Sequence, residues 1–190
     1  VLFGVGKFLR SGFGTGCATT VVMGNETMKL MVVSDLDGTL LDHSDYSFDL
    51  VLPVLDRMDE AGIPLVVNTS KTRAEWLAIR GELGNFDPYI VENGSAIYDG
   101  EKVETFGVSR AEILDVLKSL RGKFKFKGYS DVGVSEIMQW TGLGRQSAER
   151  SADRHFSEPL VWQDSPEKED EFCDLIKERG LRTLCGGRFL

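Results

Sequence analysis

The chain has 190 residues, of which 42% are hydrophobic and 27% are charged, a composition typical of a globular protein. That length suits one domain of ordinary size or a smaller domain with an insertion. The formal net charge of −8 argues against broad nucleic-acid binding, because that function needs a basic surface. No apolar run is long enough for a membrane-spanning helix, and the three widely spaced cysteines predict neither a zinc site nor a disulfide framework. We therefore expect a cytoplasmic protein with reduced thiols and with no nucleic-acid or membrane partner, while the oligomeric state is left open.

The first 27 residues differ from the rest of the chain. They are rich in glycine and threonine, begin without methionine, and contain only short, interrupted apolar stretches. These features do not match a signal peptide. A more regular pattern starts at Met28, so we expect residues 1–27 to form an arm outside the functional domain, disordered or loosely docked.

Strands and helices alternate in the pattern that follows Met28. Apolar runs predict strands over 30–35, 63–70 and 88–94. Helical spacing predicts helices over 47–62 and 72–83, and the second begins with a capping box from Thr72 to Glu75. In the first helix the residues expected to share one face are Leu50, Val54, Leu55 and Met58. This order predicts an α/β fold whose parallel sheet has right-handed crossovers.

A second α/β unit is predicted for the rest of the chain. A hairpin over 95–106, with a turn at Asp99-Gly100, is followed by a helix that a capping box opens at Ser109. Two short helices, a strand, a helix and a last strand are then expected over 134–141, 145–154, 158–164, 165–179 and 181–190. We therefore expect residues 28–106 to form the core and residues 107–190 to form a lid over it.

Two aspartates at the end of the first predicted strand suggest a chemistry. Asp35 and Asp37 are two residues apart in SDLDGTL, so their side chains can face the same cleft. Two close carboxylates need a cation or a shared proton, and their oxygen atoms suit Mg²⁺. A calcium loop of EF-hand type is excluded, because Leu40 stands where its glycine is needed and Tyr46 where its glutamate is needed. A turn with solvated acids and a phosphoryl-transfer site remain as alternatives.

Further polar residues follow the neighbouring predicted strands. Thr69 ends the second strand, and Glu92 and Asn93 end the third. Because parallel strands bring their carboxyl ends to the same edge of a sheet, these residues are expected near Asp35 and Asp37.

The motif DLDGTL together with Thr69 in VVNTSKT resembles the haloacid dehalogenase (HAD) superfamily of phosphatases. LDHSDYSFD, NTSKTRAEW, YIVENGSAIY, GYSDVGVSEI, SEPLVW and GGRF are similar to mannosyl-3-phosphoglycerate phosphatases, HAD enzymes with an inserted α/β cap of type IIB. The resemblance covers about residues 28–190. It implies a Mg²⁺-dependent hydrolysis of mannosyl-3-phosphoglycerate to mannosylglycerate through an aspartyl-phosphate.

The same resemblance implies roles for individual residues. Asp35 would be the nucleophile and Asp37 the acid/base, and both would bind the metal. The residues that would bind phosphate or the rest of the substrate are Thr69, Ser70, Lys71, Glu92, Asn93 and Arg188. A related substrate, such as glucosyl-3-phosphoglycerate, is an alternative that the sequence does not separate from the first.

The family pattern continues beyond the segments found here. It includes a later core segment with a lysine and a GD-x-x-x-D motif that completes the Mg²⁺ site, and neither is present in this sequence. We therefore expect a core that is incomplete at its C-terminus, with little phosphatase activity. A non-catalytic remnant that still binds a phosphorylated ligand is the alternative from another functional class.

Overall fold

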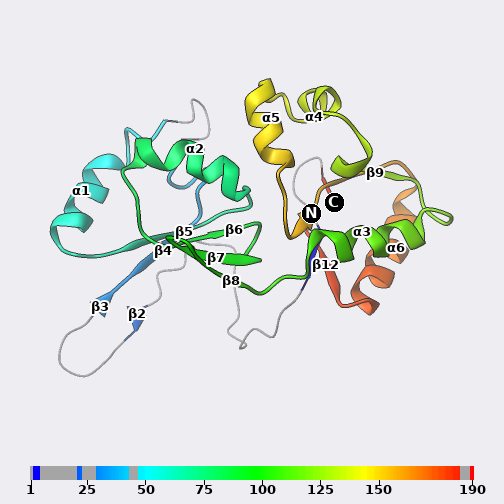
Figure 1. Cartoon of the computed structure of the whole chain (residues 1–190), viewed down its shortest axis with the longest axis horizontal. Helices are drawn as coiled ribbons and strands as arrows, with labels where there is room; N and C mark the ends of the chain where they lie inside the picture. The colour runs from blue at the N-terminus through cyan, green and yellow to red at the C-terminus, as the bar shows by residue number, and fades with distance from the viewer. Residues whose placement is uncertain (1, 5–20, 23–28, 43–46, 185–188) are drawn as a thin grey trace.

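The computed structural model describes residues 2–4, 21–22, 29–42, 47–184 and 189–190 (Figure 1). Its largest sheet has the strand order β4-β5-β6-β7-β8, with β4, β5 and β6 parallel and the last two connections antiparallel. We call this sheet and its helices the first unit. Its elements are β4 (Val32–Ser34), α1 (Leu52–Glu60), β5 (Leu65–Asn68), α2 (Arg73–Leu83), β6 (Tyr89–Val91), β7 (Ala96–Asp99) and β8 (Lys102–Thr105). The parallel, helix-connected strands confirm the predicted α/β class.

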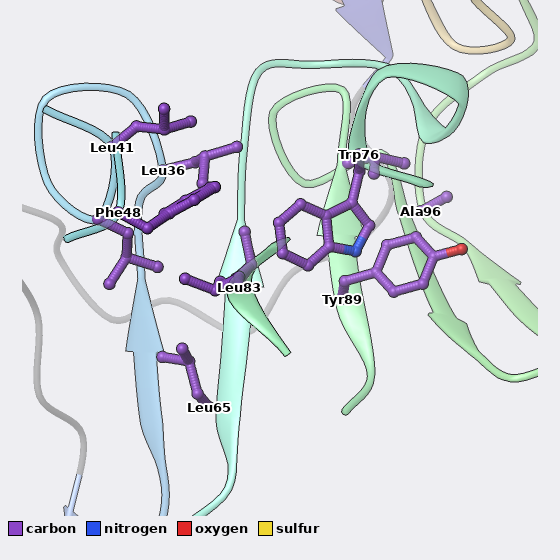
Figure 2. Close-up of a cluster of buried hydrophobic side chains, with 11 residues drawn as sticks. Leu36, Leu41, Phe48, Leu65, Trp76, Leu83, Tyr89 and Ala96 are labelled. Carbon is purple, nitrogen blue, oxygen red and sulfur yellow. The ribbon is translucent and has the colours of Figure 1, made fainter. Parts of the chain in front are cut away.

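The core of the first unit lies between the sheet and its two helices, which cover the same face (Figure 1). Trp76 of α2 is fully buried, and its ring centroid lies 6.1 Å from that of Tyr89 on β6. Figure 2 shows these two rings beside Leu83, with Leu36 and Phe48 at the other end of the cluster. Trp76 and Leu83 are the buried residues of α2, so the helix turns this face toward the sheet.

The face predicted for the first helix is partly wrong. Leu50 is 79% exposed and Val54 is 55% exposed. The helix begins only at Leu52, with Pro53 in its first turn, so Leu50 precedes the helix and does not share its period. Leu55 and Met58 of the predicted face do pack against the core, and Val51 and Leu52 pack there in place of the other two. Both predicted capping boxes are confirmed, at Thr72 and at Ser109.

We call the elements from α3 to β12 the second unit. They are α3 (Arg110–Leu120), β9 (Phe126–Gly128), the 3₁₀ turn η1 (Tyr129–Asp131), α4 (Val134–Thr141), α5 (Arg145–Ala152), β10 (Ser157–Glu158), β11 (Leu160–Trp162), α6 (Pro166–Glu178) and β12 (Leu181–Thr183). The strand predicted over 158–164 is divided into β10 and β11 at Pro159, which has no N–H to continue a ladder. No helix in the described part of the chain is long and apolar enough to cross a bilayer.

Part of the expected N-terminal arm is paired with the second unit. Strand β1 (Leu2–Gly4) lies between β10 and β12 and is antiparallel to both. A strand in this central position bonds on both edges, so the expectation of a disordered or loosely docked arm is wrong for residues 2–4. Strands β2 (Val21–Val22) and β3 (Lys29–Leu30) also pair with each other, and the remainder of 1–27 lies outside the described residues.

Candidate active site

Asp35 and Asp37 are held in place by the apolar residue between them. Leu36 is fully buried in the first core, so the two flanking aspartates point the other way, and both are exposed. The backbone N–H of Leu36 donates to Asp35 Oδ1 at 2.8 Å. Its carbonyl accepts from Leu40 and Leu41, which closes a tight turn after the strand. The turn passes through Gly38 at φ +69°, a conformation that costs glycine little.

The loop after β5 brings a cation to the aspartates. Thr69 is 2% exposed, and its backbone N–H donates to the carbonyl of Ile90 on the next strand. Its hydroxyl oxygen accepts from the backbone N–H of Lys71 at 3.1 Å. This turn directs the Lys71 side chain back toward the first strand, where its Nζ lies 2.8 Å from Asp37 Oδ1. Lys71 is half-buried and Asp37 is exposed, so water screens this contact as it does other surface ion pairs.

One cavity gathers most of the predicted site residues. It has a volume of about 350 Å³ and is lined by Asp35, Asp37, Asn68, Thr69, Ser70, Asn93 and Leu184. Asn68 precedes Thr69 at the end of β5, and its place beside a predicted site residue was a usable signal. Leu184 follows β12 of the second unit. It is more than a hundred residues from Asp35 and Thr69 in the sequence, so no local pattern indicated that it lies beside them. Another hollow, of about 380 Å³, is lined by Leu65, Leu83 and Asp87 among others and contains none of the predicted residues.

Glu92 and Arg188 are not among the residues lining this cavity. Glu92 is 1% exposed, and its carboxylate accepts hydrogen bonds from the second unit, from the backbone N–H groups of His155 and Phe156 and from the Ser157 hydroxyl. Its neighbour Asn93 does line the cavity. Arg188 lies outside the described residues, so its predicted role stays a prediction.

The sequence and the fold were compared with those of known proteins. The family model of haloacid dehalogenase-like hydrolases matches residues 32–175. The chain belongs to this family. It is also 37% identical, over 175 residues, to a protein of Persephonella marina named glucosyl-3-phosphoglycerate/mannosyl-3-phosphoglycerate phosphatase. That match covers 84% of this chain and 65% of the relative, so the chain spans less than two thirds of the relative's length.

Two solved structures share the fold. A Thermoplasma acidophilum protein matches with a TM-score of 0.60 and 16% identity, over 84% of this chain and 61% of its own. A HAD subclass IIB sugar phosphatase matches with a TM-score of 0.55 and 15% identity, over 77% of this chain and 63% of its own. At such low identity, these matches support the fold and not a substrate.

The two aspartates of the cavity offer the oxygen ligands that Mg²⁺ prefers. One oxygen of Asp35 accepts a backbone N–H and one oxygen of Asp37 contacts Lys71, so each carboxylate has a second oxygen with which to bind a cation. Within the described ranges, no group of three or more His, Cys, Asp or Glu side chains is placed to hold a metal ion. The two carboxylates are therefore of the chemical type that Mg²⁺ prefers, but the described residues supply only part of a ligand set.

Proposed function

We propose that this chain carries the nucleophile and the phosphate-binding loop of a HAD phosphatase that hydrolyses mannosyl-3-phosphoglycerate or glucosyl-3-phosphoglycerate. The observation that supports this best is the cavity in which Asp35, Asp37, Thr69, Ser70 and Asn93 meet at the carboxyl ends of three parallel strands. The printed name of the Persephonella relative supplies the substrate class.

The first chemical step transfers the phosphoryl group to Asp35. The Leu36 N–H holds Oδ1, and this orients the carboxylate so that Oδ2 can attack phosphorus. As the new O–P bond forms, the bond between phosphorus and the glycerate oxygen breaks. Asp37 in its acid form gives its proton to that oxygen, which therefore leaves as a hydroxyl group and not as an alkoxide.

The second step returns the enzyme to its starting state. Asp37, now a carboxylate, takes a proton from water while the water oxygen attacks the phosphorus of the aspartyl-phosphate. The O–P bond to Asp35 breaks, and inorganic phosphate is released. The Thr69 hydroxyl accepts from Lys71 N–H through its oxygen, so its own proton can be donated to a phosphate oxygen.

Lys71 has two partners in this cycle. In the structure its ammonium contacts Asp37, and a bound phosphate would present a stronger negative charge close to it. If Lys71 moved toward the phosphate, Asp37 would lose its ion-pair partner. Asp37 could then hold the proton that it donates to the glycerate oxygen in the first step. Mg²⁺, held in part by Asp35 and Asp37, would reduce the repulsion between the nucleophile and the phosphate.

The test is release of inorganic phosphate from each of the two phosphoglycerates in the presence of Mg²⁺. Asp35→Asn is expected to lower kcat at least about a thousandfold, because the amide cannot form the acyl-phosphate. Asp115→Asn, an exposed position on α3, is the matched control and is expected to leave the rate unchanged. Equal rates for Asp35→Asn and the parent chain would contradict the proposal, and the ratio of the two substrate rates identifies the sugar.

A second candidate is a protein that binds the phosphorylated ligand without hydrolysing it. The observation that favours it is the pair of carboxylates, with no third acidic side chain placed beside them in the described ranges. Calorimetry with mannosyl-3-phosphoglycerate distinguishes the two functions. Heat of binding without release of phosphate supports the binding protein, and release of phosphate excludes it.

A further inference from the structure

Glu92 occupies a strained position at the end of β6. Its φ is +48° and that of Asn93 is +60°, so two consecutive residues other than glycine adopt left-handed backbone conformations. Such a conformation is unfavourable for a residue with a Cβ, more so for glutamate than for asparagine, and it persists where surrounding contacts fix it. Two backbone hydrogen bonds fix this conformation: Glu92 N–H donates to the carbonyl of Lys71, and Asn93 N–H donates to the carbonyl of Thr69. The segment 92–93 is therefore bonded to residues 69–71, which we call the phosphate loop.

The side chain of Glu92 points to the second unit, away from the phosphate loop. Its Oε1 accepts from the backbone N–H of His155 at 2.9 Å. Its Oε2 accepts from the backbone N–H of Phe156 at 3.1 Å and from the Ser157 hydroxyl. A buried carboxylate needs such donors, and three of them on a residue that is 1% exposed make this a satisfied, water-excluded contact.

The segment 154–157 is anchored to the first unit at further points. Phe156 packs against the first core, and the Ser157 hydroxyl also accepts from Arg154 Nη1 at 2.9 Å. The same Arg154 nitrogen lies 3.5 Å from the carbonyl oxygen of Ser70, a residue that lines the cavity. One residue, Glu92, thus contacts the phosphate loop through its backbone and the second unit through its carboxylate.

We propose that Glu92 is a positioning residue that fixes the second unit against the phosphate loop and thereby sets the place of Asn93 in the cavity. It does not bind substrate: its oxygens are already engaged, and a negative charge would repel phosphate. The effect of Glu92 on substrate binding rests on the proposed function. The contact between the Glu92 carboxylate and residues 155–157 does not.

Glu92→Gln is the decisive substitution because it changes one atom. Whichever way the amide is turned, its NH₂ faces a backbone N–H, either that of Phe156 or that of His155. One hydrogen bond is lost and two donors are forced together. The matched control is Glu158→Gln, since Glu158 is equally buried but bonds to Arg110 and Ser130 of the second unit.

The first measurement is hydrogen exchange at residues 155 and 156. Glu92→Gln is expected to raise amide exchange there at least about tenfold, whereas Glu158→Gln raises it at Ser130 and leaves 155–156 protected. Should Glu92→Gln fail to fold, Ser157→Ala removes one hydrogen-bond donor to Glu92 without bringing two donors together, and it is expected to give a smaller increase at the same two amides. Unchanged exchange at 155–156 in the folded variants would overturn the proposal.

The second measurement separates positioning from a merely structural role. Glu92→Gln is expected to raise KM for mannosyl-3-phosphoglycerate about 10- to 100-fold with a smaller change in kcat, and Glu158→Gln to change neither. If the parent chain shows no turnover, the proposed function fails, and the dissociation constant of inorganic phosphate then decides, with an expected rise of about tenfold. If hydrogen exchange at residues 155 and 156 rises but the dissociation constant of phosphate stays unchanged, the positioning role of Glu92 is overturned.

Discussion

The substitution Thr72→Ala tests whether one hydroxyl both begins a helix and joins the two units. Thr72 is fully buried, and its Oγ1 accepts from Glu75 N–H at 3.1 Å and donates to the carbonyl of Arg150 on α5 at 2.8 Å. Loss of the N-cap costs about 1 kcal/mol. The Arg150 carbonyl keeps the backbone N–H of Asp153 but loses the hydroxyl, which adds about 1 kcal/mol, and the missing methyl adds about 1 kcal/mol more. We expect Thr72→Ala to lower the free energy of unfolding by about 3 kcal/mol.

Ser109→Ala is the matched control for this substitution. Ser109 caps α3 with the same capping box, but it is exposed and its hydroxyl bonds only within its own turn, to Glu112. We expect its loss to cost about 1 kcal/mol. Thr72→Ser keeps the hydroxyl and loses the methyl, so it should also cost about 1 kcal/mol.

Urea unfolding near neutral pH measures these differences directly. For a chain of this size each 1 kcal/mol corresponds to roughly 2–4 °C in Tm, so Thr72→Ala is expected to melt about 6–12 °C below the parent. If Thr72→Ala and Ser109→Ala agreed within about 0.5 kcal/mol, the bond from α2 to α5 would contribute nothing to stability. The reasoning that the two units support each other would then be refuted.

Three further predictions concern charge. Burial raises the pKa of Tyr129 above its usual 10.0, so stability should fall as pH rises past that value, and Tyr129→Phe should remove this loss in alkaline urea titrations. Hydrogen bonds from Ser109 lower the pKa of Glu112, so the cost of Ser109→Ala should shrink as pH falls through that lowered pKa; a cost independent of pH would contradict this. Lys71→Met should weaken calorimetric binding of inorganic phosphate about tenfold, most strongly at low salt, whereas Lys102→Met on β8 should not.

Much of the cavity could be predicted because its geometry is local. The carboxyl ends of adjacent parallel strands meet at one edge, so Asp35, Asp37, Thr69 and Asn93 needed only three strands and their order. Leu36 adds a second local constraint, because the burial of the residue between them turns both aspartates outward. Beyond the pairing of these three strands, no contact between distant parts of the chain enters this reasoning.

Strand β9 was missed although the sequence carries its signal. In KFKFKG, Phe124 and Phe126 are buried while Lys123, Lys125 and Lys127 are exposed, which is the alternation of a half-buried strand. A search for helical spacing passes over a period of two. The divided strand β10–β11 has a similar lesson, because Pro159 marks the interruption in the sequence itself.

Glu92 shows where sequence reasoning stops. Its position after β6 placed it correctly at the edge that holds the site, and its acidic side chain suggested a role in the cleft. Which way that side chain turns depends on donors 63–65 residues later in the chain, on a segment whose docking no local pattern encodes. Burial decides between the alternatives: a carboxylate that is 1% exposed and holds three donors would have to lose all of them to reach a ligand. We expect these contacts to hold Asn93 at the cavity, so that two neighbouring residues at the end of one strand would have different roles.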